Sequence, residues 1–261
     1  MTFGINLLSI IAVREAPSHK SEMVNQLLFG EVFQVEVIKG DWAYIASSHD
    51  NYKGWIDKKQ MVGIGEQEYE RMRGDDISVC TDIAQIVHNK SANDLISVVA
   101  GSSLPVPEKD NAFSMAGREF SYEGMRADLV NVQMPSQLAQ IAEMFKGVPY
   151  LWGGRSPFGL DCSGFTQLVF KIGGFKIARD ASDQAGEGDL VDFFEHAQAG
   201  DLCFFDNEQG DITHVGVYMG NDHIIHAHGK VRIDRVDHQG IYSKDDRRYS
   251  HHLRLIKRLH S

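Results

Sequence analysis

The sequence predicts an α+β fold in which short, strand-rich segments precede a region with helices first and a sheet after. Three observations lead to this prediction. Short alternating strands separated by turns fill residues 1 to about 65. Helical periodicity begins near Pro135. Three alternating segments then follow between Asp201 and His228, and a helix-rich half followed by a sheet-rich half is typical of an α+β domain.

Composition limits the class of protein. A chain of 261 residues with 43% hydrophobic residues is long enough for a sizeable core and for more than one domain. The net charge of -10 and the pI near 5.6 argue against nucleic acid or an anionic membrane as a partner. No stretch approaches the roughly 18 to 20 apolar residues of a membrane span, so none is expected.

Cysteine usage and the N-terminal residues bear on location. The three cysteines lie far apart and form no C-x-x-C pair, which fits a reducing compartment better than a disulfide scaffold. The apolar run from Ile5 to Val13 lacks a basic region before it and a cleavage site after it, so it reads as a strand and not as a signal peptide. We therefore expect a cytoplasmic protein, with the periplasm as the alternative if a leader has been removed.

Residues 1–65 are predicted to form a small β-barrel. Residues 32–38 nearly alternate, Lys39-Gly40-Asp41 is a turn, and residues 42–46 alternate again. The order of Gly30-Glu31, Gly40-Asp41-Trp42 and Gly54-Trp55-Ile56 resembles a bacterial SH3-like domain.

Residues 66–132 are predicted to form a second, degenerate SH3-like barrel. Residues 67–73 are polar with a helical pattern, and residues 77–88 and 95–100 have the composition of strands. Residues 102–111 contain two prolines and read as a loop, and residues 120–124 as a last hairpin. Residues 133–261 then form the third predicted domain.

A thiol stands where a helix is expected to begin. Asp161 is a predicted N-cap, and apolar residues then recur at helical spacing until Gly173-Gly174 ends the pattern. Cys162 in the first turn would lie at the positive end of the helix dipole, which favours the nucleophilic thiolate. The alternative for a lone cysteine is a small buried core residue.

Histidines on neighbouring strands supply a candidate base. His214 opens an alternating strand, and residues 220–222 read as a loop. With a three-residue loop, His214 faces His228, and His226 lies diagonally from His214 within about 7–8 Å; a two-residue loop would turn the other face. A zinc site using His226 and His228 is the rival interpretation, but no third ligand stands nearby. We interpret the remaining candidates in this region as surface residues: His223, His238, His251 and His252.

Four motifs in order carry a family resemblance: YLWGG from residue 150, LDCSGF from residue 160, GDL from residue 200 and HVGVY from residue 214. Over residues 135–261 they resemble the NlpC family of papain-like cysteine peptidases. The resemblance implies Cys162 as nucleophile, His214 as general base and His226 as the group that orients it. It places Tyr150 at the oxyanion, with the Cys162 backbone N–H, and Trp152 in the pocket lining. It implies no cofactor and no metal.

The resemblance also implies a substrate class. SH3-like material before the peptidase is similar to enzymes that act on free murein-derived peptides of the form L-Ala-γ-D-Glu-diamino acid, in which acidic groups hold the substrate ammonium. Asp161 matches one such group, and Glu22 and Tyr52 are candidates for the others. Two segments resemble the contacts to the γ-D-glutamyl residue: one contains Ser163, and the other is the run from Arg179 to Gln184, which includes Asp180 and Ala181. Some relatives carry serine at the Ala181 position, so either one contact is missing or Ser182 replaces it.

The expected function is a γ-D-glutamyl-L-diamino acid endopeptidase of peptidoglycan peptide recycling, acting through a thioester. Three alternatives stay open at this point. A hydrolase of intact cell wall would tolerate a blocked substrate amine. An inactive wall-binding module would turn over no muropeptide, and an acyltransferase would give aminolysis products faster than hydrolysis products.

Overall fold

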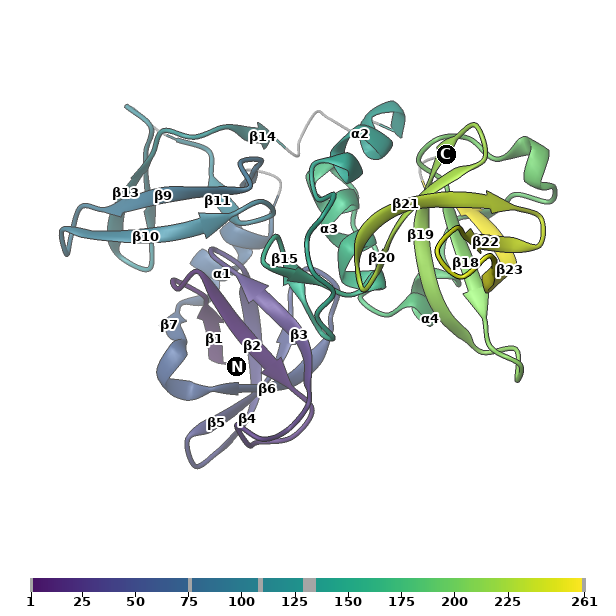
Figure 1. Cartoon of the computed structure of the whole chain (residues 1–261). Helices are drawn as coiled ribbons and strands as arrows, with labels where there is room; N and C mark the ends of the chain where they lie inside the picture. Colours follow the sequence, from purple (N-terminus) through teal and green to yellow (C-terminus); the bar gives the residue numbers. More distant parts are fainter. Residues whose placement is uncertain (1, 75–76, 108–109, 129–134, 260–261) are drawn as a thin grey trace. The chain divides into compact units, whose positions relative to one another are not determined.

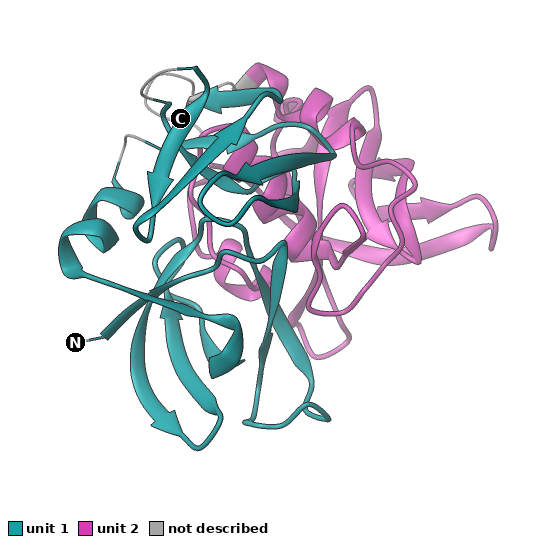
Figure 2. Cartoon of the chain, turned by 90° about the vertical axis from the view of Figure 1, so that its left-hand side faces the viewer, with its two compact units in different colours: residues 1–132 teal, residues 133–261 magenta. Residues whose placement is uncertain are grey.

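The computed structural model describes residues 2–74, 77–107, 110–128 and 135–259. The chain divides into two compact units, residues 1–132 and 133–261, coloured separately in Figure 2. The predicted boundary between residues 132 and 133 lies outside the described residues. Among the residues that are described, no helix is both long and apolar enough to cross a membrane.

The first unit begins with a seven-stranded antiparallel sheet in the order β3-β2-β6-β5-β4-β1-β7 (Figure 1). In β5 the alternation expected from the sequence places Ala43 and Ile45 in the core. A 3₁₀ turn, Lys58–Gln60, precedes the last strand. The strands are β1 (Thr2–Ile5), β2 (Ile10–Arg14), β3 (Met23–Leu28), β4 (Val32–Lys39), β5 (Trp42–Ser47), β6 (Lys53–Asp57) and β7 (Val62–Ile64).

Helix α1 (Glu66–Arg73) and two smaller sheets follow, with strand orders β10-β9-β13-β12 and β11-β8-β14. The predicted strand over residues 77–88 is two strands, and the predicted loop over 102–111 contains β11, while residues 108–109 lie outside the description. The strands are β8 (Ile77–Cys80), β9 (Ala84–Asn89), β10 (Asp94–Val99), β11 (Ser103–Pro105), β12 (Ala112–Met115), β13 (Arg118–Tyr122) and β14 (Arg126–Asp128).

The two halves of the first unit share one apolar core. Phe3 of β1 stacks on Tyr69 of α1 at 4.3 Å between ring centroids, and Phe29 meets Phe120 of β13 edge-on at 5.9 Å. All four side chains belong to one buried cluster. The described residues of 1–65 and of 66–132 therefore share this core, and the second barrel stays a prediction.

The second unit packs helices against one antiparallel sheet, which confirms the predicted α+β class. Helices α2 (Leu138–Glu143) and α3 (Cys162–Ile172) contact β19 and β20 (Figure 1). The sheet order is β17-β23-β18-β19-β20-β21-β22. Its strands are β17 (Asp189–Leu190), β18 (Leu202–Asp206), β19 (Ile212–Gly220), β20 (His223–His228), β21 (Lys230–Asp237), β22 (Gly240–Ser243) and β23 (Arg248–Arg258). Shorter elements are η2 (Pro135–Gln137), β15 (Arg155–Ser156), β16 (Gly159–Leu160), α4 (Ala181–Gln184) and η3 (Phe194–His196).

The β19–β20 hairpin departs from the predicted loop length. Its loop is the two residues Asn221 and Asp222, both with positive φ (51° and 57°), as a type I′ turn requires. The predicted three-residue loop is therefore wrong. A β-bulge between Tyr218 and Gly220 inserts one residue and pairs Gly216 with His226. Because the bulge compensates for the shorter loop, His214 and His226 still lie on the same face of the sheet, as the longer loop would place them.

Candidate active site

Helix α3 begins at Cys162, and its N-cap is Asp161, as the sequence predicts. The Asp161 carboxylate accepts a 2.6 Å hydrogen bond from the Gly164 backbone N–H, a contact typically worth about 1 kcal/mol. Gly164 is required here because a Cβ atom would overlap the carbonyl oxygen of Gly154. The first turn therefore fixes the position of the thiol through the cap and this close backbone approach.

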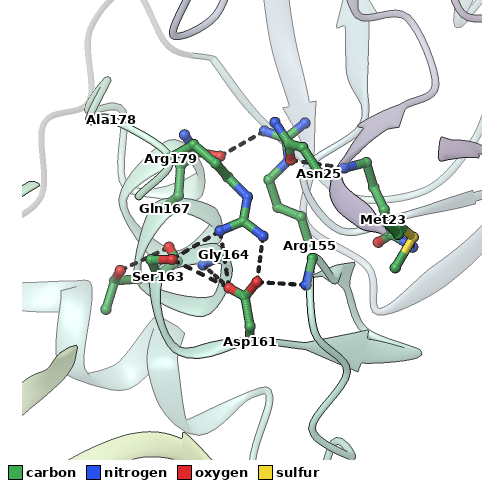
Figure 3. Close-up of polar contacts among 12 residues, drawn as sticks. Met23, Asn25, Arg155, Asp161, Ser163, Gly164, Gln167, Ala178 and Arg179 are labelled. Carbon is green, nitrogen blue, oxygen red and sulfur yellow. Dashed lines mark hydrogen bonds and ion pairs between the residues drawn. The ribbon is translucent and has the colours of Figure 1, made fainter. Parts of the chain in front are cut away.

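Asp161 also lies in a buried ion pair with Arg179 (Figure 3). One guanidinium nitrogen donates to each carboxylate oxygen, at 3.0 and 2.5 Å, and the Gly153 N–H donates at 2.8 Å. Arg179 also donates to the Ser163 hydroxyl at 2.9 Å. Sequence reasoning placed Asp161 and Ser163 in the site and Arg179 in the segment that resembles a glutamyl contact, but it did not foresee the ion pair between Arg179 and Asp161.

The thiol of Cys162 is buried against β19, where the Val215 backbone N–H lies beside it. Burial, followed by the negative charge of Asp161, raises the pKa of Cys162 to about 11, although this N–H and Arg179 act in the opposite direction. Burial therefore outweighs the helix start, which was expected from the sequence to favour the thiolate. A neutral thiol needs a base to remove its proton before it can attack.

Tyr150 and Trp152 lie just before β15. Burial, followed by the charges of Cys162 and Asp161, raises the pKa of Tyr150 to about 12, so the phenol keeps its proton near neutral pH and can donate a hydrogen bond. Its predicted role at the oxyanion stays a prediction. Trp152 is 61% exposed and is therefore not a core residue, and its predicted place in the pocket lining stays a prediction.

His214 and His226 form a direct pair. His214 Nε2 lies 2.8 Å from His226 Nδ1, and both side chains are buried. The bond occupies Nε2 of His214 and leaves Nδ1 as the ring nitrogen that can exchange a proton. Burial, followed by the neighbouring imidazoles, lowers the pKa of His214 well below its usual range. His214 is therefore neutral at pH 7, as a general base must be.

Behind His226 stands a carboxylate that sequence reasoning missed. Asp234 Oδ2 lies 3.0 Å from His226 Nε2, and Asp234 also forms an ion pair with Arg232. In the register of β20 with β21, Arg232 faces His226, and Asp234 lies one diagonal step away on the same face. The charged residues along 230–237 were the sequence signal that could have indicated Asp234. Using that signal required the register of β21 against β20.

His251 is not the surface residue that the sequence suggested. Its ring stacks on His214 with centroids 4.2 Å apart and lies 5.0 Å from His228. Burial, followed by the charges of His226 and His228, lowers the pKa of His251 to about 4, so it is neutral near pH 7. His251 lies on β23, far from His214 in the sequence. The alternation of residues within one strand cannot predict that the two rings meet.

A metal site was the rival interpretation of these histidines. In the described parts of the chain, no group of three or more His, Cys, Asp or Glu side chains is arranged to hold a metal ion. His226 instead directs both ring nitrogens to protein partners.

The predicted glutamyl contacts flank α4. Asp180 is half-buried and precedes the helix, accepting from the Asp183 and Gln184 N–H groups through its backbone carbonyl. Ala181 opens the helix and offers no polar side chain, while Ser182 is exposed. Gln184 donates to the Ser163 carbonyl at 3.1 Å, which ties α4 to the start of α3.

Glu22 and Tyr52 belong to the first unit. Glu22 is exposed at the start of β3, and Tyr52 is half-buried before β6. The backbone of Tyr52 is held by the Asp50 carboxylate at 3.0 Å and by the Ser47 N–H at 2.9 Å. The roles of Glu22 and Tyr52 toward a substrate stay predictions.

Comparisons with known proteins agree with this geometry. A model of the NlpC/P60 family matches residues 147–249, and one of the bacterial dipeptidyl-peptidase Sh3 domain matches residues 13–61. The chain is 34% identical over 216 residues to a "Gamma-D-glutamyl-L-lysine dipeptidyl-peptidase" of Bacillus subtilis, covering 77% of this chain and 71% of that protein. It is 25% identical to "Dipeptidyl-peptidase 6" of Lysinibacillus sphaericus, over 88% and 90% of the two chains.

A solved structure supports the fold. The crystal structure of an NlpC/P60 family protein from Bacillus cereus superposes with a TM-score of 0.84 at 22% identity, over 99% of this chain and 100% of that one. Together with the matched SH3 segment, this fold confirms an NlpC/P60 domain preceded by SH3-like β structure. The chain belongs to the NlpC/P60 family and is a cysteine peptidase.

Proposed function

We propose that this chain cleaves the bond between γ-D-glutamate and an L-diamino acid in free peptides that begin with L-Ala, releasing the dipeptide L-Ala-γ-D-Glu. The observation that carries the proposal is the pairing, in one chain, of a dipeptidyl-peptidase SH3 segment at 13–61 with an NlpC/P60 segment at 147–249. The name of the B. subtilis relative supports this bond and the release of a dipeptide, and the name of the L. sphaericus relative supports the release of a dipeptide.

The site supports a thioester route. His214 Nδ1 takes the thiol proton, and the Cys162 sulfur attacks the γ-carbonyl carbon of the D-glutamyl residue. The Tyr150 hydroxyl and the Cys162 backbone N–H stabilise the oxyanion. The protonated His214 then gives its proton to the leaving amine, which breaks the C–N bond. In the second half, His214 takes a proton from water, whose oxygen attacks the thioester and releases Cys162.

For the cell, the proposal is a cytoplasmic role in recycling peptidoglycan peptides. Free stem peptides are the substrate form that such recycling handles. The sparse, unpaired cysteines support a reducing compartment, since Cys80, Cys162 and Cys203 are all free thiols.

The test is mass spectrometry of L-Ala-γ-D-Glu-L-Lys and its diaminopimelate counterpart after incubation with the protein. The wild type should release L-Ala-γ-D-Glu from at least one of them, and Cys162→Ala should release none. An intact peptide after incubation with the wild type, or equal cleavage by the variant, would overturn the proposal.

The second candidate is hydrolysis of intact cell wall. The chain is 41% identical to "Probable endopeptidase p60" of Listeria seeligeri, but only over 100 residues, 38% of this chain and 19% of that protein. A tripeptide with an acetylated N-terminus separates the two candidates. A dipeptide-releasing enzyme should lose activity on the blocked peptide, because burying an acetyl group at an ammonium site removes the charge that the site recognises. A wall hydrolase should cleave both peptides.

A further inference from the structure

The His214–His226 pair contains an ambiguity that its geometry alone does not resolve. A hydrogen bond between His214 Nε2 and His226 Nδ1, 2.8 Å apart, needs one N–H donor and one lone-pair acceptor. If His214 donates, its Nδ1 carries the lone pair that can accept the thiol proton. If His226 donates, Nδ1 of His214 is protonated and cannot act as a base. The two tautomeric arrangements therefore differ in catalytic competence.

The group bonded to the other ring nitrogen of His226 distinguishes the two arrangements. In the competent arrangement, His226 presents an Nε2–H group, and in the other it presents an Nε2 lone pair. Asp234 Oδ2 lies 3.0 Å from this nitrogen, and an ionised carboxylate can only accept hydrogen bonds. A lone pair facing a carboxylate would be repelled, whereas an N–H forms a charge-assisted bond.

Arg232 keeps the carboxylate ionised and in place. Its Nε lies 2.6 Å from Asp234 Oδ2, and a second nitrogen donates to Oδ1 at 2.8 Å. Burial acts to raise the pKa of Asp234, but the hydrogen bonds from His226 and Arg232 outweigh it and lower the pKa to about 2. Asp234 is 6% exposed, so this charge is fixed beside His226.

We propose that Asp234, held by Arg232, is a positioning residue that selects the tautomers of both histidines, so that His214 presents an unprotonated Nδ1 toward Cys162. Asp234 touches neither the thiol nor the substrate and acts entirely through His226. Its charge also stabilises the imidazolium that forms when the thiol proton is transferred. The proposal rests on the proposed role of His214 as general base.

The first test needs no substrate. Two-bond ¹H–¹⁵N correlation spectra of ¹⁵N-histidine protein at pH 7.5 identify the protonated nitrogen of each ring, with His214→Gln and His226→Asn samples for assignment. The expected result is Nε2–H on both His214 and His226. An Nδ1–H tautomer on His226 in the wild type would overturn the proposal, and this outcome does not depend on the substrate assignment. Inactivity of the wild type on the tripeptides with the expected tautomers would count against the proposed function alone.

The second test changes the charge. In Asp234→Asn, the amide N–H₂ can donate to an unprotonated Nε2, so the unproductive tautomer becomes accessible. We expect kcat to fall about 100-fold, the scale of a general-base contribution, with little change in KM. The acid limb of kcat/KM should move to lower pH, because the coupled imidazoles lose the charge that favours their protonation. Groups that also face the pair are His228, His251 and Arg232, which this variant leaves in place.

A matched control and a double variant separate positioning from a structural role. Asp245→Asn makes the same chemical change on the other side of Arg232, where the side chain is 75% exposed, and should leave kcat and the pH profile unchanged. In a His226→Asn background, the amide oxygen can accept from His214 Nε2 without help from Asp234, because an amide has no ring tautomers to select. There, Asp234→Asn should cost less than about threefold. An equal loss in both backgrounds, or a loss without a shifted acid limb, would contradict action through His226.

Discussion

Two of the carboxylate–arginine pairs in the second unit differ in what they support. Asp161 and Arg179 lie at the start of α3, where the carboxylate also caps the helix that carries Cys162. Asp234 and Arg232 lie on β21, behind the histidines. The Arg179 side chain is 1% exposed, whereas that of Arg232 is 24% exposed and reaches the exposed Asp245. The Asp161–Arg179 pair is therefore part of the folded core. The Asp234–Arg232 pair instead connects the partly exposed Arg232 to His226, the partner of the base His214.

Because of this difference in exposure, we expect changes to the first pair to lower the stability of the fold and changes to the second to lower the catalytic rate. Removing one partner of a fully buried pair leaves an uncompensated charge, which is costly for folding. Removing Asp234 from the second pair leaves an arginine that water and Asp245 can still solvate, so the main effect should fall on the histidine tautomers. The predictions below test this separation, from the largest expected effect to the smallest.

Loss of the thiol should have the largest effect. Cys162→Ala removes the nucleophile, and the rate on L-Ala-γ-D-Glu-L-Lys should fall by about 10⁴-fold or more. The matched control is Cys203→Ala, another buried free cysteine, in β18. It should keep kcat within about twofold while losing about 1 kcal/mol of stability. Comparable loss of activity in both variants would contradict the assignment of the nucleophile.

Breaking the core pair should mainly cost stability. Arg179→Ala should lower the free energy of unfolding by about 3–5 kcal/mol, because Asp161 stays buried without its counter-ion. Asp161→Asn keeps the cap acceptor, since asparagine caps helices well, so any loss reports the ion pair. Urea denaturation measures both variants. An Arg179→Ala loss below about 1 kcal/mol would show that water replaces the guanidinium and would remove the proposed contrast with Arg232.

The reactivity of Cys162 should depend on pH in a way that reflects its burial. With a raised pKa of about 11, the thiolate fraction increases about tenfold per pH unit through neutral pH, and alkylation by iodoacetamide should follow it. The rate, measured from intact mass, should still be rising at pH 9. A plateau already reached below pH 7 would contradict this prediction and would indicate a preformed thiolate–imidazolium pair.

Loss of the exposed Arg232–Asp245 ion pair should have the smallest effect on stability and activity. Asp245→Ala removes only an exposed partner of Arg232, and surface ion pairs of this kind contribute about 0–1 kcal/mol. Its urea midpoint and kcat should match the wild type within error. A clear loss of activity would show that Arg232 cannot hold Asp234 alone.

Much of the site could be predicted because its signals are local. The cap at Asp161, the helical spacing after it and the glycine stop lie within one continuous segment, and α3 spans Cys162–Ile172 accordingly. The approach of His226 to His214 required only one hairpin. Even there, the loop length was wrong, and the facing was preserved because a bulge after Tyr218 compensated for it.

The contacts that were missed join distant segments of the chain. Arg179 reaches Asp161 across 18 positions, Asp234 requires the register of β21, and His251 arrives from β23. The residue spacing within a single strand or helix predicts none of these contacts. The pKa of Cys162 was mispredicted for a similar reason, since burial by the rest of the unit outweighs the local helix start.

The central claim is that Cys162 forms a thioester with the L-Ala-γ-D-Glu portion of the substrate. Acid quenching during turnover of L-Ala-γ-D-Glu-L-Lys, followed by peptide mapping under acidic conditions, detects this intermediate directly. The expected result is a dipeptidyl acyl group on the peptide that contains Cys162, sensitive to hydroxylamine. Turnover with the acyl group on the Cys80 or Cys203 peptide instead would contradict the account.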